Sequence, residues 1–141
     1  MNAQVTSSGV VVPSGDGRVY VRKVAGDYGG YKWSFAKGRI EPGLTLEENA
    51  LKELREEMGR EARIVAVLGD YGGDTGTTRF FIGEATGGDT NNIGPETEEV
   101  RLVGYEEASQ LLNRKRDRDV LDDLYRRLPE LLASEGGSPS G

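Results

Sequence analysis

Residues 45–59 carry the signals of one complete amphipathic helix. Thr45 followed by Glu48 forms a capping-box pattern, in which the hydroxyl and the carboxylate satisfy two backbone amides at the helix start. Gly59 stands where a glycine in the left-handed conformation commonly ends a helix. The apolar stripe between these signals recurs at steps of three and four residues and consists of Ala50, Leu51, Leu54 and Met58. The sequence therefore predicts a helix with one buried face.

Three glutamates occupy a different face of this helix. Glu53, Glu56 and Glu57 fall at positions i, i+3 and i+4, a spacing at which like charges repel and destabilise an isolated helix. A loop with glycines and cations, residues 37–43, precedes the helix. Its carbonyl oxygens and the glutamate oxygens would form the all-oxygen environment that Mg²⁺ or Mn²⁺ prefers. A solvated acidic face is the alternative, and the loop in front of the helix favours the metal site.

Residues 38–60 resemble the Nudix box, whose pattern is G-x5-E-x7-R-E-U-x-E-E-x-G-U, with U a bulky apolar residue. The positions that match without a gap include Gly38, Glu53, Glu56, Glu57 and Gly59. The resemblance implies an α/β/α sandwich and a hydrolase acting on a nucleoside diphosphate linked to another group. It also implies Mg²⁺ or Mn²⁺ as the cofactor, held by the glutamates.

Three positions depart from the Nudix pattern. Leu44 stands where the first glutamate is expected, Lys52 where the arginine is expected, and Arg60 where an apolar residue is expected. In the family the arginine orients the adjacent catalytic glutamate, and the first glutamate supports the same polar network. Lysine is a point charge without the planar guanidinium fork. Because the metal ligands themselves are intact, we expect metal binding to survive, with turnover retained at a reduced rate.

The composition removes several kinds of chemistry. The 141 residues contain no cysteine and no histidine, which excludes thiolate nucleophiles, imidazole bases and zinc sites built from those residues. Acid–base chemistry must therefore use carboxylates, lysines, tyrosines or metal-bound water. The net charge of −6 argues against nucleic acid or an anionic membrane as a partner, but a phosphate-rich small ligand remains compatible. Without a transmembrane-length apolar run or a recognisable signal peptide, a cytoplasmic protein is expected.

The remaining sequence alternates strand, loop and helix signals. Strands are expected over residues 5–13, 18–25, 33–35, 62–68, 77–84 and 100–104, with the first two paired as a hairpin. Further helices are expected over residues 106–112 and 119–132, and loops over residues 26–32, 69–76 and 87–99. This order predicts a single α+β domain over residues 1–133, with a mixed sheet flanked by helices. Residues 134–141 are expected to be a disordered Gly/Ser/Pro tail.

The predicted catalytic centre lies on the glutamate helix. Glu56 and Glu57 are expected to be the principal metal ligands, joined by a backbone carbonyl near Gly38. Glu53 is expected to be either a further ligand or the base that activates water, since the resemblance implies both arrangements. A fourth carboxylate is expected from Glu98, with Glu99 as the second choice, and a solvated acidic loop is equally compatible.

Substrate contacts are predicted from several segments: Arg39, Lys37, Lys52, Trp33 and Tyr71. Arg39 is the best candidate for direct phosphate contact. Trp33 either stacks on a nucleobase or packs beneath the loop, and packing is favoured. Tyr71 lies in a glycine-rich loop that lacks the lysine and spacing of a P-loop. The basic run at residues 114–118 is either solvated or faces a phosphate.

The substrate class follows from the resemblance. The segment WSFAKGRIEPG resembles the W-x-x-P-K-G-R-x-E-x-G opening of enzymes acting on dinucleoside or diphosphoinositol polyphosphates, with Ala36 in place of the proline. The segment EVRLV at residues 99–103 also resembles that group, with Leu102 where tryptophan is frequent. A phosphorylated nucleotide is therefore the expected partner, with diadenosine polyphosphates as the best candidates. A (d)NTP pyrophosphohydrolase and a catalytically weakened nucleotide-binding module are the alternatives. A homodimer is compatible with the sequence, which does not fix the oligomeric state.

Overall fold

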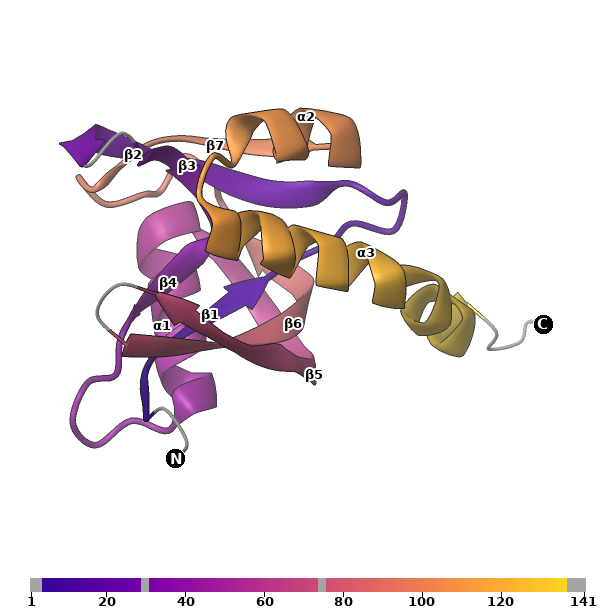
Figure 1. Cartoon of the computed structure of the whole chain (residues 1–141), viewed down its shortest axis with the longest axis horizontal. Coiled ribbons are helices and arrows are strands. Elements are labelled where there is room, and N and C mark those ends of the chain that lie inside the picture. Colours follow the sequence, from indigo (N-terminus) through magenta and orange to yellow (C-terminus); the bar gives the residue numbers. More distant parts are fainter. Residues whose placement is uncertain (1–3, 29–30, 74–75, 137–141) are drawn as a thin grey trace.

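The computed structural model describes residues 4–28, 31–73 and 76–136, which form two β-sheets and three helices (Figure 1). The strands are β1 (Val5–Val11), β2 (Val19–Tyr28), β3 (Tyr31–Ser34), β4 (Ala36–Arg39), β5 (Arg60–Gly73), β6 (Gly76–Gly88) and β7 (Thr97–Val103). The helices are α1 (Leu46–Met58), α2 (Tyr105–Leu111) and α3 (Lys115–Gly136). The predicted α+β class, with a mixed sheet flanked by helices, is confirmed.

The seven strands divide between two sheets. Four form a mixed sheet in the order β4-β1-β6-β5, in which β1 runs parallel to β6 and antiparallel to β4. The other three form an antiparallel sheet in the order β3-β2-β7. In Figure 1 the three-stranded sheet and α2 lie above the four-stranded sheet. The first strand of the chain is therefore a central strand of the larger sheet.

Two hydrophobic clusters lie on opposite faces of the four-stranded sheet. One packs the apolar face of α1 against the sheet and contains Val10, Val12, Ala36, Ala50, Leu54, Met58 and Phe81. The other joins the four-stranded sheet to the three-stranded sheet and α3, through residues that include Val11, Val21, Phe80, Leu121 and Leu124. Because neighbouring strand residues point to opposite faces, the run Val10–Val12 supplies both clusters. The glutamate helix is thus fixed on one face and α3 on the other.

The predicted pairing of residues 5–13 with 18–25 as a hairpin is wrong. β1 and β2 belong to different sheets, and an isolated bridge between Pro13 and Val19 joins the ends of the two segments. The physical reason is that β1 is buried on both faces and needs a hydrogen-bonding neighbour on each edge. β4 and β6 take those two edges.

The predicted loop at residues 69–76 is also wrong over its described part. β5 and β6 form a long antiparallel pair whose register continues to Gly73 opposite Gly76. Backbone hydrogen bonds between β5 and β6 hold these glycines in the sheet, although glycine has no side chain that could pack there. The glycine content therefore wrongly indicated a loop. Similarly, β2 and β3 extend into the expected loop at residues 26–32, and β6 and β7 shorten the one at 87–99.

The helices follow their sequence signals closely. The capping box of Thr45 and Glu48 is present, and Gly59 caps α1 with a φ of 67°. α3 is longer than predicted, because it begins at Lys115 and continues to Gly136. It thereby includes residues 134–136 of the expected tail, while residues 137–141 lie outside the described part of the chain. None of the helices within the described ranges is long and apolar enough to span a membrane.

Candidate active site

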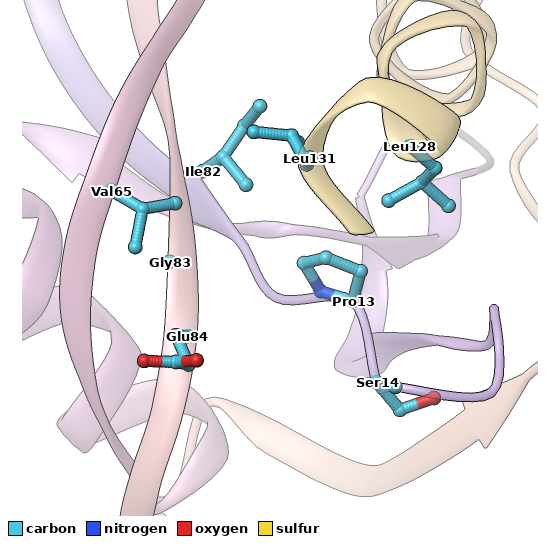
Figure 2. Close-up of a pocket in the computed structure, with 9 residues that line it drawn as sticks. Pro13, Ser14, Val65, Ile82, Gly83, Glu84, Leu128 and Leu131 are labelled. Carbon is cyan, nitrogen blue, oxygen red and sulfur yellow. The ribbon is translucent and has the colours of Figure 1, made fainter. Parts of the chain in front are cut away.

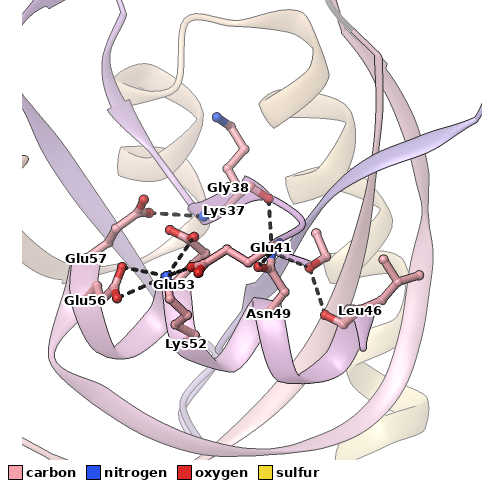
Figure 3. Close-up of polar contacts among 10 residues, drawn as sticks. Lys37, Gly38, Glu41, Leu46, Asn49, Lys52, Glu53, Glu56 and Glu57 are labelled. Carbon is pink, nitrogen blue, oxygen red and sulfur yellow. Dashed lines mark hydrogen bonds and ion pairs between the residues drawn. The ribbon is translucent and has the colours of Figure 1, made fainter. Parts of the chain in front are cut away.

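The three clustered glutamates of α1 lie in different environments (Figure 3). Glu57 is buried, with 7% of its surface exposed. The Glu53 side chain is 13% exposed, whereas that of Glu56 is 56% exposed. Residues four apart share a helix face, so Glu53 and Glu57 both turn towards β4 while Glu56 stays at the solvent edge. One turn of helix therefore offers two sheltered carboxylates and one accessible carboxylate.

Glu57 is held between the two sheets. The backbone N–H of Lys37 on β4 donates a 3.1 Å hydrogen bond to its Oε1, and the Arg22 Nε on β2 lies 3.7 Å from the same oxygen. Burial raises the pKa of Glu57 to about 8, which Arg22 and the Lys37 amide oppose and the nearby Glu53 carboxylate reinforces. Without a metal, burial therefore favours the protonated form of this carboxyl.

Arg22 is a site residue that the sequence analysis missed. Its Nε donates to Thr97 Oγ1 at 2.8 Å, and its Nη2 donates to the Glu96 carbonyl at 2.9 Å. These two hydrogen bonds fix the guanidinium beside Glu57. The available signal was a charged residue within the valine-rich strand β2. The positions of its partners, seventy-odd residues away, were not visible in the sequence.

Gly38 brings the strand backbone against the Glu53 carboxylate. A Cβ at this position would lie within 2.7 Å of both carboxylate oxygens of Glu53. Any other residue would therefore displace that side chain. The absence of a side chain here is what lets Glu53 lie against the strand at its present depth.

Asn49 fixes the loop between β4 and α1. Its buried amide donates to Ser8 Oγ at 3.1 Å and to the Gly38 carbonyl at 3.2 Å, and its Oδ1 accepts from the Glu41 N–H at 3.2 Å. The Gly38 carbonyl, predicted as a metal ligand, thus already accepts a hydrogen bond from Asn49. Asn49 was not identified from the sequence, where it read as one polar residue of an amphipathic helix.

Lys52 places a positive charge among the acidic side chains. Its Nζ lies 3.1 Å from Glu56 and 3.6 Å from Glu53, and it also pairs with Glu41 (Figure 3). The hydrogen bonds to Glu41 and Glu56 raise the pKa of Lys52 above its usual value. Glu41 thus supplies an acidic partner for Lys52, although Leu44 occupies the position where the Nudix pattern has one.

These residues fit a divalent cation by their donor chemistry. Hard carboxylate oxygens from Glu53, Glu56 and Glu57 are the ligands that Mg²⁺ and Mn²⁺ prefer. The Lys52 ammonium already serves as a cation between two of them. Within the described residues no three such side chains converge on one point, since Glu53 and Glu56 share the ammonium while Glu57 faces Arg22. A cation bound between Glu53 and Glu56 would therefore take the place of the Lys52 ammonium.

The predicted outlying site residues have other contacts. Glu98 pairs with Lys23 at 3.3 Å on the exposed side of β7, and Glu99 pairs with Arg101. Trp33 is 8% exposed within the core between the sheets, and the Arg101 guanidinium lies over its ring at 4.7 Å. The structure brings neither Glu98 nor Trp33 into contact with the glutamates of α1 among the interactions of the described residues.

Tyr71 lies on β5 rather than in a loop. Its hydroxyl donates to Asp123 of α3 at 2.6 Å, and its ring packs edge-on against Phe80. Burial raises the pKa of Tyr71. These contacts give it a structural role, and its predicted substrate contact stays a prediction.

Lys37 and Arg39 line a basic pocket with a volume of about 330 Å³. Arg114, just before α3, and Arg116, in the first turn of α3, line the same pocket. Burial lowers the pKa of Lys37, and the charges of Arg116 and Arg114 lower it further. A phosphate-facing role was one of the two alternatives for the 114–118 run, and nothing in the local sequence placed that run beside β4.

Two further hollows have different linings. One, of about 120 Å³, lies between β5, β6 and α3 and is lined by mainly apolar side chains such as Val65, Ile82 and Leu128 (Figure 2). It is smaller than the range of roughly 300–1,000 Å³ typical of ligand pockets. The other, of about 480 Å³, lies beside Glu56 and the 92–96 loop. The glutamates are therefore flanked by one open hollow and, across β4, by the basic pocket.

Comparisons with known proteins identify relatives of the whole domain. The NUDIX domain family model matches residues 4–124. A putative 8-oxo-dGTP diphosphatase of Bacillus subtilis is 34% identical over 73 residues, covering 50% of this chain and 49% of the relative. An RNA pyrophosphohydrolase of Novosphingobium aromaticivorans is 36% identical over 62 residues, covering 44% of this chain and 38% of the relative. The chain thus spans about half or less of the length of these curated relatives.

Solved structures share the fold at lower identity. A C. elegans Ap4A hydrolase superposes with a TM-score of 0.73 at 16% identity, covering 90% of this chain and 99% of that one. A NUDIX hydrolase from Nitrosomonas europaea superposes with a TM-score of 0.76 at 14% identity, covering 87% of this chain and 90% of that one. At these identities the similarity concerns the fold alone.

Proposed function

Because this chain belongs to the NUDIX domain family, we propose that it is a metal-dependent pyrophosphohydrolase acting on a nucleoside diphosphate linked to another group. The observation that carries the proposal is the turn of α1 bearing Glu53, Glu56 and Glu57 against the side-chain-free backbone of Gly38. Three carboxylates at this spacing are costly unless positive charge joins them. The names of the curated relatives, which include a putative diphosphatase and a pyrophosphohydrolase, support the same reaction class.

Glu53, Glu56 and Glu57 would hold Mg²⁺ or Mn²⁺, with the Gly38 carbonyl as a further ligand. When bound, such a cation neutralises phosphate oxygens and makes water more acidic. Glu98 was predicted as a fourth ligand, and its pairing with Lys23 means that it would have to leave that partner to serve. The choice between magnesium and manganese stays open in this proposal.

The residues of the chain divide the remaining work. Glu53 either completes the ligand set or accepts the proton of the attacking water, and its position against Gly38 suits both. Glu57 would bind the metal as the charged carboxylate, so the proton that burial favours in the metal-free chain would leave when the cation binds. Arg39 and Lys37 would position phosphates of the substrate by charge-assisted hydrogen bonds. Positioning and charge stabilisation are the main requirements of phosphoryl transfer.

Diadenosine polyphosphates are the substrate class we propose first. The resemblance of residues 33–43 to enzymes of that class supports it, and the C. elegans Ap4A hydrolase has the same fold. A (d)NTP pyrophosphohydrolase is the second candidate, which the putative 8-oxo-dGTP diphosphatase among the relatives favours. A weakened nucleotide-binding module is the third, because Leu44 and Lys52 depart from the family pattern. Cytoplasmic location and a homodimer stay predictions.

A substrate panel tests these proposals. Phosphate release would be measured with Mg²⁺ and with Mn²⁺ over dinucleoside polyphosphates, (d)NTPs, ADP-ribose and diphosphoinositol phosphates. Metal-dependent turnover of diadenosine tetraphosphate at the highest kcat/KM supports the first candidate, and preference for a (d)NTP supports the second. Ligand binding without turnover of any compound would reject the enzyme and favour the binding module.

A further inference from the structure

The open hollow of about 480 Å³ lies at the C-terminal end of α1, beside the acidic turn. Its side-chain lining comes from the last turn of α1 and from the loop before β7, and consists of Arg55, Glu56, Asn92, Ile93, Pro95 and Glu96. The volume lies within the range of roughly 300–1,000 Å³ that is typical of ligand pockets. Because Glu56 belongs both to the hollow and to the acidic turn, a group bound here would lie next to the proposed metal ligands.

Backbone hydrogen bonds fasten the loop wall of the hollow to α1. The N–H of Gly94 donates to the Glu56 carbonyl at 2.9 Å, and the N–H of Asp89 donates to the Gly59 carbonyl at 2.7 Å. A Cβ added at Gly59 would lie 2.0 Å from the Asp89 carbonyl oxygen, so the helix end and the loop can approach this closely only at a glycine. These contacts fix the hollow in position relative to Glu56.

The charges of the lining disfavour a phosphate in this hollow. Glu56 and Glu96 contribute two carboxylates, whereas Arg55 contributes one guanidinium. The Arg55 Nη1 already lies 3.8 Å from Glu61 Oε1. A bound anion would therefore meet more negative than positive charge, and a neutral group fits the lining better.

The lining suits the faces and the edge of a nucleobase. Ile93 and Pro95 offer apolar surface to a ring. The Arg55 guanidinium can lie over a ring face, because its half-exposed pair with Glu61 contributes little to stability. The exposed Asn92 amide can donate to N7 of adenine and accept from the N6 amine of the same base.

The single tryptophan is a less accessible platform for a base. Trp33 is 8% exposed within the core between the sheets, and the Arg101 guanidinium lies 4.7 Å from the centre of its ring. A base stacked on Trp33 would have to displace Arg101 and open the core. The hollow beside Glu56 requires no such rearrangement.

We infer that this hollow binds the nucleobase of the substrate and that the base is adenine, held by Asn92, Arg55 and Ile93. The inference rests on the proposed function and specifies where the nucleoside end of the substrate lies. It places the base beside the exposed Glu56, so the phosphates linked to that base would begin next to the acidic turn.

Titration of the isotope-labelled protein with adenosine in EDTA, followed by NMR, tests the hollow without metal and without turnover. The backbone amide signals of Arg55, Glu56 and residues 92–94 are expected to shift. Asn92→Ala should weaken adenosine binding at least about tenfold, because the paired hydrogen bonds to the base are lost. Ile93→Ser should weaken it at least about threefold through the loss of apolar contact.

Asn91→Ala is the matched control, because Asn91 is an exposed asparagine of the same loop that does not line the hollow. It should change adenosine binding less than about twofold. Unchanged amide signals outside the loop show in each variant that the fold is intact. Inosine, which carries a carbonyl oxygen in place of the N6 amine, should bind at least about fivefold more weakly than adenosine, because it cannot donate to the Asn92 oxygen.

Four results would overturn the inference: no shift at millimolar adenosine, shifts confined to residues outside the hollow, an equal loss in Asn91→Ala, or inosine binding as tight as that of adenosine. Adenosine bound in the hollow of a protein that hydrolyses no compound of the substrate panel would reject the hydrolase and keep the base site. An active enzyme whose KM for diadenosine tetraphosphate is unchanged in Asn92→Ala would reject the base site and keep the hydrolase.

Discussion

The ammonium of Lys52 lies 3.1 Å from the carboxylate of Glu56, on the turn of α1 that is proposed to bind a divalent cation. The same ammonium is 3.6 Å from Glu53. An internal cation therefore neutralises the acidic turn in the metal-free protein. It offsets the repulsion that the spacing of the glutamates would otherwise produce.

Replacing this lysine should strengthen metal binding. In Lys52→Met the two carboxylates lose their internal counter-ion, so a divalent cation no longer competes with it. We expect the Mg²⁺ affinity to rise about fivefold, which corresponds to one weak ion pair. Isothermal titration with MgCl₂ measures this, and Lys115→Met, which changes an exposed lysine of α3, is the control. An affinity equal to or below that of the unmodified protein would contradict the competition.

Glu53→Gln and Glu57→Gln should each reduce turnover by orders of magnitude while leaving the fold intact. Each replacement keeps the shape of the side chain but removes the negative charge that holds a metal or accepts a proton. Phosphate release measures the rate and circular dichroism checks the fold. Glu47→Gln, an exposed glutamate in the first turn of α1, is the matched control. Near-normal rates in both variants would remove the proposed mechanism.

The stability of the metal-free protein should fall as pH rises from about 5 to about 8. The pKa of Glu57 is raised from 4.5 to about 8 in the folded chain, mainly by burial. Between those values the folded state holds a proton that the unfolded state has lost, so raising the pH favours unfolding. The contribution of Glu57 to the free energy of unfolding is fully present below the pKa of Glu57 in the unfolded chain. It disappears above the pKa of Glu57 in the folded chain. This contribution is expected to be on the order of a few kcal/mol.

Urea denaturation in EDTA across pH 5 to 9 measures this effect. Glu57→Gln should remove most of the slope, because the amide does not titrate yet still accepts from the Lys37 N–H. A slope of the same size in this variant would assign the pH dependence of stability to other groups.

In the unmodified protein near pH 7, Mg²⁺ binding should also release about one proton, since the metal favours the charged carboxylate. Titration in buffers of different ionisation enthalpy detects that proton.

Two glycines of the four-stranded sheet should respond differently to alanine. In Gly38→Ala the new Cβ meets the end of the flexible Glu53 side chain, which can rotate away. We expect Mg²⁺ affinity and kcat to fall at least about tenfold, with less than about 1 kcal/mol lost in stability. In Gly9→Ala the Cβ meets the Ala36 carbonyl and the Phe80 ring, so stability should fall by about 2–3 kcal/mol. Urea denaturation and activity together separate the two effects, and equal stability losses would contradict the distinction.

Local signals were sufficient to predict α1 and its glutamates. Thr45, Glu48 and Gly59 cap the ends of α1 through contacts with residues a few positions away. Such local capping does not depend on the tertiary structure, so the sequence alone is enough to predict it. The strand pairing was harder, because the partners of β1 come from the distant strands β4 and β6. The glycines at 72 and 73 predicted a loop. The backbone hydrogen bonds of the β5–β6 ladder nevertheless stabilise the strand by more than the conformational entropy that these glycines lose.

The candidate site residues on α1 follow the family pattern, whereas others come from tertiary contacts that the pattern does not include. Glu53 lies against Gly38, while Glu56 stays at the solvent edge of the turn and Glu57 faces Arg22. Arg22 comes from the other sheet and Arg116 from the last helix, and nothing in their local sequence connects them to β4. Glu41 lies within the pattern, yet the pattern gave no reason to pair it with Lys52.

The central place of β1 has a consequence for biosynthesis. All residues of the acidic turn have left the ribosome early, but β1, on which α1 and β4 rest, receives its second edge from β6, where Val5 lies opposite Thr77. Such long-range parallel pairing is slow to form. A nascent chain therefore exposes its acidic helix before the sheet beneath it is complete, and the capacity to bind metal should emerge only after β6 has been synthesised.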